Sequence, residues 1–136
     1  MTSKIFVNIP VKNLDKSIAF FTKMGYTFNP KFTNDKAGCL VISEHIYAML
    51  LTEPFFKGFT NKEVCDTSKS AEAIIALSAD SKDEVNDLVN KAKAAGATTP
   101  IDPVDHGDYM YQWGFHDLDG HQWELFYMDE SKFPAQ

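Results

Sequence analysis

The chain has 136 residues, of which 44% are hydrophobic and 24% are charged. This length fits a single soluble domain and is well below the size at which hydrophobic cores usually divide. The 19 acidic side chains outnumber the 13 basic ones, and the net charge of −6 disfavours nucleic acid and anionic membrane surfaces as partners. No apolar run approaches the length of a spanning helix, and no signal peptide is visible.

The two cysteines, Cys39 and Cys65, are far apart in the sequence and form no CxxC pair. This spacing indicates neither a zinc ribbon nor the disulfide framework of a small secreted domain, although one bridge between them stays open. We therefore expect a reducing, cytoplasmic setting for the protein.

The first half of the chain reads as one strand, one helix and three further strands. Residues 4–11 alternate with the two-residue period of a strand. Asn13 can cap a short amphipathic helix, and Gly25 ends its apolar pattern. Three strand-like runs follow at residues 26–31, 38–43 and 46–52.

The same order recurs in the second half. A strand is expected over residues 73–79, and Ser81 with Glu84 has the spacing of a capping box at the start of a helix. Gly96 ends that helix. Three more strands are expected at residues 98–101, 109–116 and 121–128.

The repeated order indicates an internal duplication with a period of about 70 residues. We expect one domain, residues 1–136, made of a module at 4–53, a connecting segment at 54–72 and a module at 73–128. A short helix over a sheet edge is expected in the connecting segment. This segment contains Phe55, Phe56 and Phe59. These side chains either pack in the core or form a lid over a pocket.

Two motifs carry a family resemblance, VKNLDKS at residues 11–17 and DLDGHQWEL at residues 117–125. With the duplicated order between them, the sequence resembles the vicinal oxygen chelate superfamily of glyoxalase I, extradiol dioxygenases, fosfomycin resistance enzymes and bleomycin resistance proteins. The resemblance implies an α+β fold in which two βαβββ modules form a curled, cup-shaped mixed sheet around one site. It also implies a homodimer.

Alternation assigns side chains to the inside of that cup. If Val7, Ile9 and Val11 pack under the helices, the side chains of Phe6 and Asn8 face the cup. The same parity turns the following residues inward in the second module: Ile74, Ala76, Ser78, Gln122, Glu124 and Phe126.

The family's metal-binding positions carry over to four residues here: Phe6, Ile74, Ala48 and Glu124. Only Glu124 has a donor atom, and one carboxylate does not hold a catalytic metal. The alternative metal set is His106, His116 and Glu124, although a bulge at Gly114 would leave the direction of His116 open. No cofactor is expected, with a divalent metal as the alternative.

The sequence therefore favours a metal-free, bleomycin-resistance-like protein that sequesters an aromatic or cationic compound by ring stacking and cation–π attraction. Its expected ligand-binding residues are Phe6, Asn8, Tyr47, Tyr111, Trp113, Gln122 and Glu124. In the alternative, the rings are ordinary core and Glu124 pairs with Asn8 or a tyrosine hydroxyl. The rival functions are a glyoxalase-like lyase or isomerase or an extradiol-type dioxygenase with a shifted metal site, and an interaction protein with a filled cup. No catalytic residue can be assigned.

Overall fold

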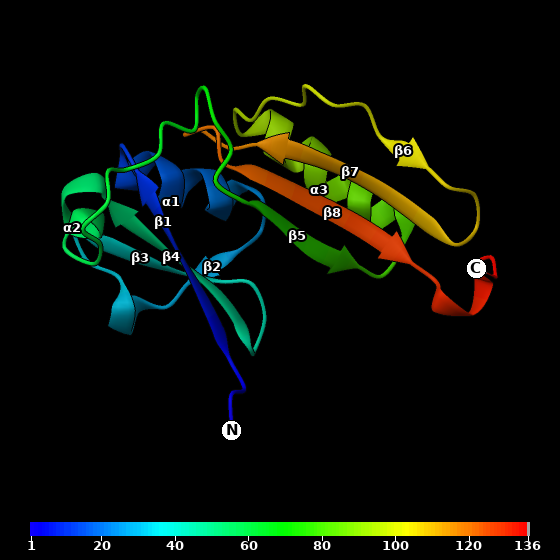
Figure 1. Ribbon diagram of the computed structural model, residues 1–136, viewed down its shortest axis with the longest axis horizontal. Helices are drawn as coiled ribbons and strands as arrows, with labels where there is room; N and C mark the ends of the chain where they lie inside the picture. Colours follow the sequence, from blue (N-terminus) through cyan, green and yellow to red (C-terminus); the bar gives the residue numbers. More distant parts are fainter. Residues whose placement is uncertain (136) are drawn as a thin grey trace. The chain divides into compact units, whose positions relative to one another are not determined.

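The computed structural model describes residues 1–135 and forms two compact units, one spanning Met1–Asp66 and the other beginning at Thr67. The boundary falls within the expected connecting segment, residues 54–72. Each unit contains a four-stranded mixed sheet with a helix packed on it (Figure 1). The predicted fold class, α+β with two βαβββ modules, is confirmed, and both sheets are open.

The first sheet has the order β1-β4-β3-β2, in which β1 and β4 are parallel and the other pairs antiparallel. Its elements are β1 (Ile5–Val11), α1 (Leu14–Lys23), β2 (Thr27–Phe28), the 3-10 turn η1 (Pro30–Phe32), β3 (Ala37–Val41), β4 (Ile46–Thr52) and α2 (Glu53–Lys57). The expected short helix after β4 is thus present as α2, which packs against β1 and β4.

Helix α1 begins where the sequence predicts. The side-chain oxygen of Asn13 accepts a hydrogen bond of 3.0 Å from the backbone N–H of Lys16, which satisfies one of the free donors of the first turn. Gly25 then adopts φ +102, a left-handed conformation that glycine tolerates, and the helix ends. Its buried residues include Leu14, Phe20 and Phe21, and this face covers the sheet.

The second sheet repeats this arrangement with the order β5-β8-β7-β6. Its elements are β5 (Ile74–Ala79), α3 (Lys82–Ala94), β6 (Val104–Asp105), β7 (Met110–His116), β8 (Gln122–Met128) and the 3-10 turn η2 (Glu130–Lys132). Figure 1 shows α3 running along one face of this sheet, where it packs on β7 and β8. Ser81 caps α3 by accepting from the N–H of Glu84 at 3.1 Å, as predicted.

Two of the expected strands are wrong in extent because of proline. The run 26–31 is a strand only at β2, since Pro30 has no N–H to donate and starts η1. The expected strand at 98–101 forms a single bridge, between Thr98 and His116. Pro100 and Pro103 interrupt further pairing there, and the edge strand β6 begins only after them.

The cysteines and the phenylalanines of the connecting segment lie in the first unit. Cys39 and Cys65 are both free thiols, and burial raises the pKa of the Cys39 thiol. The ring of Phe59 packs edge-on against that of Phe55 at 5.2 Å between centroids, yet Phe59 is 70% exposed. Within residues 1–135, no helix combines the length and apolar character required to cross a membrane.

Candidate functional site

The two faces of the second sheet have different roles. Trp123 and Leu125 of β8 are almost completely buried, as is Phe115 of β7, and these side chains form the face under α3. We call this the helix face, and we call the opposite side the open face. Because side chains alternate along a strand, Gln122 and Glu124 lie on the open face, as the sequence predicted.

The register of β7 places His116, which the sequence left undetermined. The pairing with β8 runs without interruption from Met110 to His116, so no bulge occurs at Gly114. His116 pairs with Gln122 and Gly114 pairs with Glu124. The side chain of His116 therefore shares the open face with Glu124, which lies two residue pairs along the ladder.

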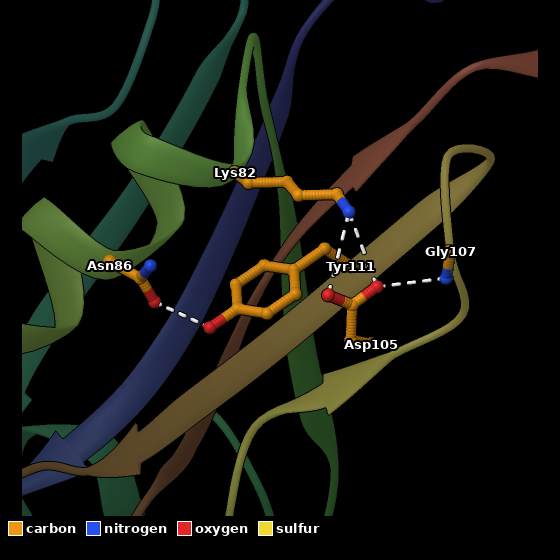
Figure 2. Close-up of polar contacts among 5 residues, drawn as sticks. All are labelled: Lys82, Asn86, Asp105, Gly107 and Tyr111. Carbon is orange, nitrogen blue, oxygen red and sulfur yellow. Dashed lines mark hydrogen bonds and ion pairs between the residues drawn. The ribbon is translucent and has the colours of Figure 1, made fainter.

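In the same register, Tyr111 and Trp113 occupy helix-face positions of β7, whereas Gly114 is the residue paired with Glu124 on the open face. The hydroxyl of Tyr111 donates a hydrogen bond of 2.6 Å to Oδ1 of Asn86 on α3 (Figure 2). The indole of Trp113 lies 5.8 Å from Nζ of Lys93 on α3. The helix thus holds Tyr111, whereas the indole N–H of Trp113 donates a hydrogen bond of 3.1 Å to the carbonyl oxygen of Ile101.

A small cavity of about 40 Å³ lies in the second unit, beside β7, β8 and the segment that leads into β6. Its polar side chains come from the open face and that segment, and its apolar wall includes Pro100, Ile101 and Val104. The polar lining residues are Asp102, Gln112, His116, Gln122 and Glu124. Of the expected ligand-binding residues in this unit, the cavity brings together Gln122, Glu124 and Trp113, but not Tyr111.

The rim of this cavity is anchored to α3 by an ion pair. Nζ of Lys82 lies 3.2 Å from Oδ1 of Asp105, which follows the rim residue Val104 (Figure 2). The same oxygen accepts the backbone N–H of Gly107 at 2.8 Å. These two donors hold the pKa of the Asp105 carboxyl below its ordinary value, the Gly107 hydrogen bond being the larger cause.

The first unit presents its own group of expected residues. The rings of Phe6 on β1 and Tyr47 on β4 are stacked, with centroids 4.7 Å apart and planes at 11°. Phe6 is 48% exposed, so this pair offers an open aromatic surface. Asn8 lies on the same face of β1 and donates at 3.4 Å to the carbonyl oxygen of Phe6. All three residues therefore lie on one sheet face.

The expected first-module counterpart of Glu124 is corrected by one residue. In the second sheet Ile74 pairs with Gln122 and Ala76 with Glu124. The matching pairs in the first sheet are Phe6 with Tyr47 and Asn8 with Met49, so the counterpart is Met49. Ala48, the expected residue, is fully buried on the opposite face.

The donor atoms do not fit the divalent metal that the family resemblance implies for some members. The carried-over positions contribute one carboxylate, that of Glu124, together with Phe6, Ile74 and the thioether of Met49. No group of three or more His, Cys, Asp or Glu side chains within residues 1–135 is placed to hold a metal ion. The alternative set of His106, His116 and Glu124 is therefore not assembled, and the ring of His106 instead packs near Tyr109.

Gln112 and the wall at residues 100–104 are parts of the site that sequence reasoning missed, and it left the direction of His116 open. The available signal was the two-residue period of β8. Once Trp123 is assigned to the core, the hairpin pairing places Phe115 opposite it and turns His116 to the other face.

Comparison with known proteins places this geometry in a family. The model of the glyoxalase/bleomycin resistance protein/dioxygenase superfamily matches residues 5–125. A structure of a hypothetical protein from S. aureus is similar, with a TM-score of 0.77, 26% identity and coverage of 93% of this chain and 94% of that one. No curated protein sequence matches the chain.

Two more distant structures support the fold alone. A family enzyme from Burkholderia phytofirmans PsJN has a TM-score of 0.74 and 18% identity, covering 91% of this chain and 97% of that one. The fosfomycin resistance protein FosX from Listeria monocytogenes has a TM-score of 0.68 and 17% identity, covering 96% of this chain and 97% of that one.

Proposed function

Because the chain belongs to the glyoxalase/bleomycin resistance protein/dioxygenase superfamily, we propose that it binds a small molecule, and that it sequesters an aromatic cation without a metal ion. The observation that carries the proposal is the position of Glu124. Its carboxylate lines a cavity on the open face of the second module, with one further carboxylate, Asp102, and no lysine among the lining residues.

The charge of the chain supports a cationic ligand. A cavity lined by two carboxylates attracts positive charge, and the net charge of −6 adds a field of the same sign. The 13 basic residues of the chain are all lysines, so the chain lacks the guanidinium fork that favours bidentate binding of carboxylate or phosphate groups. Anionic substrates are therefore the poorer match.

The aromatic pair of the first module supports the second part of the proposal. The stacked rings of Phe6 and Tyr47 present an open π surface, and such surfaces attract cations and flat rings. Nζ of Lys4 already lies 5.7 Å from the centroid of Tyr47. An aromatic cation would meet both kinds of attraction at these two rings of the first unit alone.

The rival function is a metal-dependent lyase, isomerase or dioxygenase with a shifted metal site. His116 shares the open face with Glu124, which gives this rival two potential donors. A catalytic divalent ion in proteins usually takes three protein ligands. Within residues 1–135 no three His, Cys, Asp or Glu side chains are placed to hold one ion, which is the reason that we favour the binding protein, and we derive no reaction step through a metal.

We further propose that the protein acts as a homodimer. Strands β1 and β5 are edge strands of their sheets. Each carries an exposed isoleucine: Ile5 on β1 is 54% exposed, and Ile74 on β5 is 55% exposed. Exposed apolar side chains on edge strands favour association. Light scattering during size exclusion is expected to give twice the chain mass of 15.3 kDa.

The binding proposal is tested by titrating benzylamine, benzyltrimethylammonium and neutral benzyl alcohol into chelator-treated protein, following tryptophan fluorescence. Both cations are expected to bind better than the alcohol. Glu124→Gln should weaken cation binding about ten-fold or more, because it removes the charge but keeps the shape. Glu130→Gln is the matched control, since this exposed glutamate on η2 undergoes the same change away from the cavity.

Metal analysis of protein purified without chelator completes the test. A stoichiometric ion that is lost in Glu124→Gln would overturn the metal-free proposal and favour the enzyme. Equal binding of cations and benzyl alcohol would overturn the cationic ligand.

A further inference from the structure

The segment between α3 and β7 bulges away from the second sheet and forms one wall of the cavity. It pairs with β7 at two places, the bridge between Thr98 and His116 and the pair of Val104 with Gln112 (Figure 1). Residues 99–103 therefore stand opposite the shorter stretch 113–115 of β7. Because the longer side cannot lie flat in the ladder, it arches outward, as the extra residue of a β-bulge does.

This arch is held at its middle and at its end. The indole N–H of Trp113 binds the carbonyl oxygen of Ile101, which fixes the backbone of the arch against β7. At the end of the arch, Val104 is followed directly by Asp105 and its ion pair with Lys82 (Figure 2). The wall thus keeps its position without a ligand, and this preorganisation lowers the cost of binding.

Two apolar side chains of this wall are exposed. Val104 pairs with Gln112, so its side chain lies on the open face with that residue. Ile101 is 58% exposed and Val104 is 39% exposed, and both line the cavity. Phe115 and Trp123 also line it but are almost completely buried. Ile101 and Val104 therefore offer apolar surface that a ligand can contact, whereas Phe115 and Trp123 do not.

The size of the cavity determines which part of a ligand meets this surface. About 40 Å³ holds a few groups of the size of water, and an ammonium group is of that size. A benzyl or hexyl group is several times larger, so it has to lie against the side chains that are exposed around the cavity. Those side chains include Ile101 and Val104, and the carboxylate of Glu124 lines the same cavity.

We infer that Ile101 and Val104 form the subsite for the apolar group of an amphipathic cation whose charged group lies toward Glu124. This inference rests on the proposed function and names the residues that select the ligand. Burial of apolar area is non-directional, so this subsite accepts an alkyl chain as well as an aromatic ring. The ligand class therefore widens from aromatic cations to cations with any apolar group of similar size.

The test compares three amines that share one charge, methylamine, n-hexylamine and benzylamine. Binding is followed by NMR at the side-chain amide of Gln122, which lines the cavity and is retained in every variant. Wild-type protein is expected to bind n-hexylamine and benzylamine each at least about ten-fold more tightly than methylamine.

Two wall variants are expected to reduce only the apolar part of the affinity. Ile101→Ser should weaken n-hexylamine and benzylamine binding about three- to ten-fold and leave methylamine binding unchanged, because it removes apolar surface and no charge. Val104→Thr, which keeps the shape of the side chain, should act in the same direction. Ile101→Val should retain most of the wild-type affinity.

Leu118→Ser is the matched control. Leu118 is an exposed aliphatic side chain in the β7–β8 turn of the same unit and does not line the cavity. This variant should leave all three affinities unchanged. A direct readout is the methyl ¹³C shift of Ile101, which should move on addition of n-hexylamine and stay in place with methylamine.

The outcomes separate this inference from the proposed function. Benzylamine binding that is much tighter than n-hexylamine binding and unchanged in Ile101→Ser would overturn the wall subsite and leave the proposed function standing. An equal loss for all three amines in Ile101→Ser would overturn it as well, because the wall would then not act through the apolar group. Failure of every amine to bind at millimolar concentration would overturn the proposed function and the subsite with it.

Discussion

The indole Nε1 of Trp123 donates a hydrogen bond of 3.0 Å to Oδ2 of Asp117, inside the core of the second module. The other carboxylate oxygen accepts the backbone N–H groups of Asp119 and His121, both at 3.0 Å. Burial raises the pKa of Asp117, and the charge of His121 is the largest of the effects that oppose this rise. One buried carboxylate thus holds the β7–β8 turn and fixes the largest core side chain.

We expect Asp117→Asn to destabilise the fold at neutral pH by about 2–4 kcal/mol. The amide nitrogen would replace one acceptor oxygen and face a donor, either the indole N–H or the two backbone N–H groups. Urea denaturation followed by tryptophan fluorescence measures the change. Asp108→Asn, in the exposed loop before β7, is the control and should change stability by less than about 0.5 kcal/mol. Equal unfolding midpoints for the two variants would contradict a stabilising role for Asp117.

Gly114, inside strand β7, is a second position besides Asp117 at which we expect a substitution to destabilise the module. A Cβ atom at this residue would clash with the carbonyl oxygen of Trp123 on the paired strand. We expect Gly114→Ala to cost about 1–3 kcal/mol, because the backbones of β7 and β8 would have to move apart. Gly58→Ala, at a residue with φ −70, controls for the general effect of replacing glycine. Denaturation midpoints that fall equally in both variants would contradict the clash.

The ion pair at the cavity rim predicts a pH dependence. A carboxyl whose pKa is lower in the folded state contributes stability above its unfolded pKa, near 3.8, and loses it as pH falls through the folded value. The Gly107 amide donates to Asp105, so its ¹H and ¹⁵N shifts should titrate with a midpoint below 3.8. Asp105→Asn should abolish this titration. A midpoint above 3.8 would show that the Gly107 and Lys82 donors do not favour the charged form.

The faces of β8 could be predicted from the sequence because its alternation is clear. Trp123 and Leu125 are apolar, and Gln122 and Glu124 between them are polar, which fits one buried face. The caps of α1 and α3 could be predicted for a similar reason, since Asn13 and Ser81 each precede an apolar periodic run. For these elements, the residues of the element itself and its capping residue were sufficient for the prediction.

The faces of β4 and β7 do not follow from their own alternation, because both of their sides carry apolar or aromatic residues. Ala48 and Met49 are equally plausible core residues by type, and only the pairing with β1 separates them. Tyr111 and Trp113 resemble a ligand-stacking pair in sequence, but Asn86 of α3 holds Tyr111 on the helix face, and of the two only Trp113 lines the cavity. The register depends on how two strands pair, so it cannot be read from the residues of one strand alone.

The assignment of Tyr111 to the helix face leads to the last prediction. Tyr111→Phe removes the hydroxyl that donates to Asn86 at 2.6 Å, so we expect a loss of about 1 kcal/mol in the free energy of unfolding. Benzylamine affinity should stay unchanged, because Tyr111 does not line the cavity. Denaturation and fluorescence titration of Tyr111→Phe beside Glu124→Gln measure both effects. If Tyr111→Phe weakened binding as much as Glu124→Gln does, the ligand would have to contact the α3 side of the sheet, and the open face would not be the binding surface.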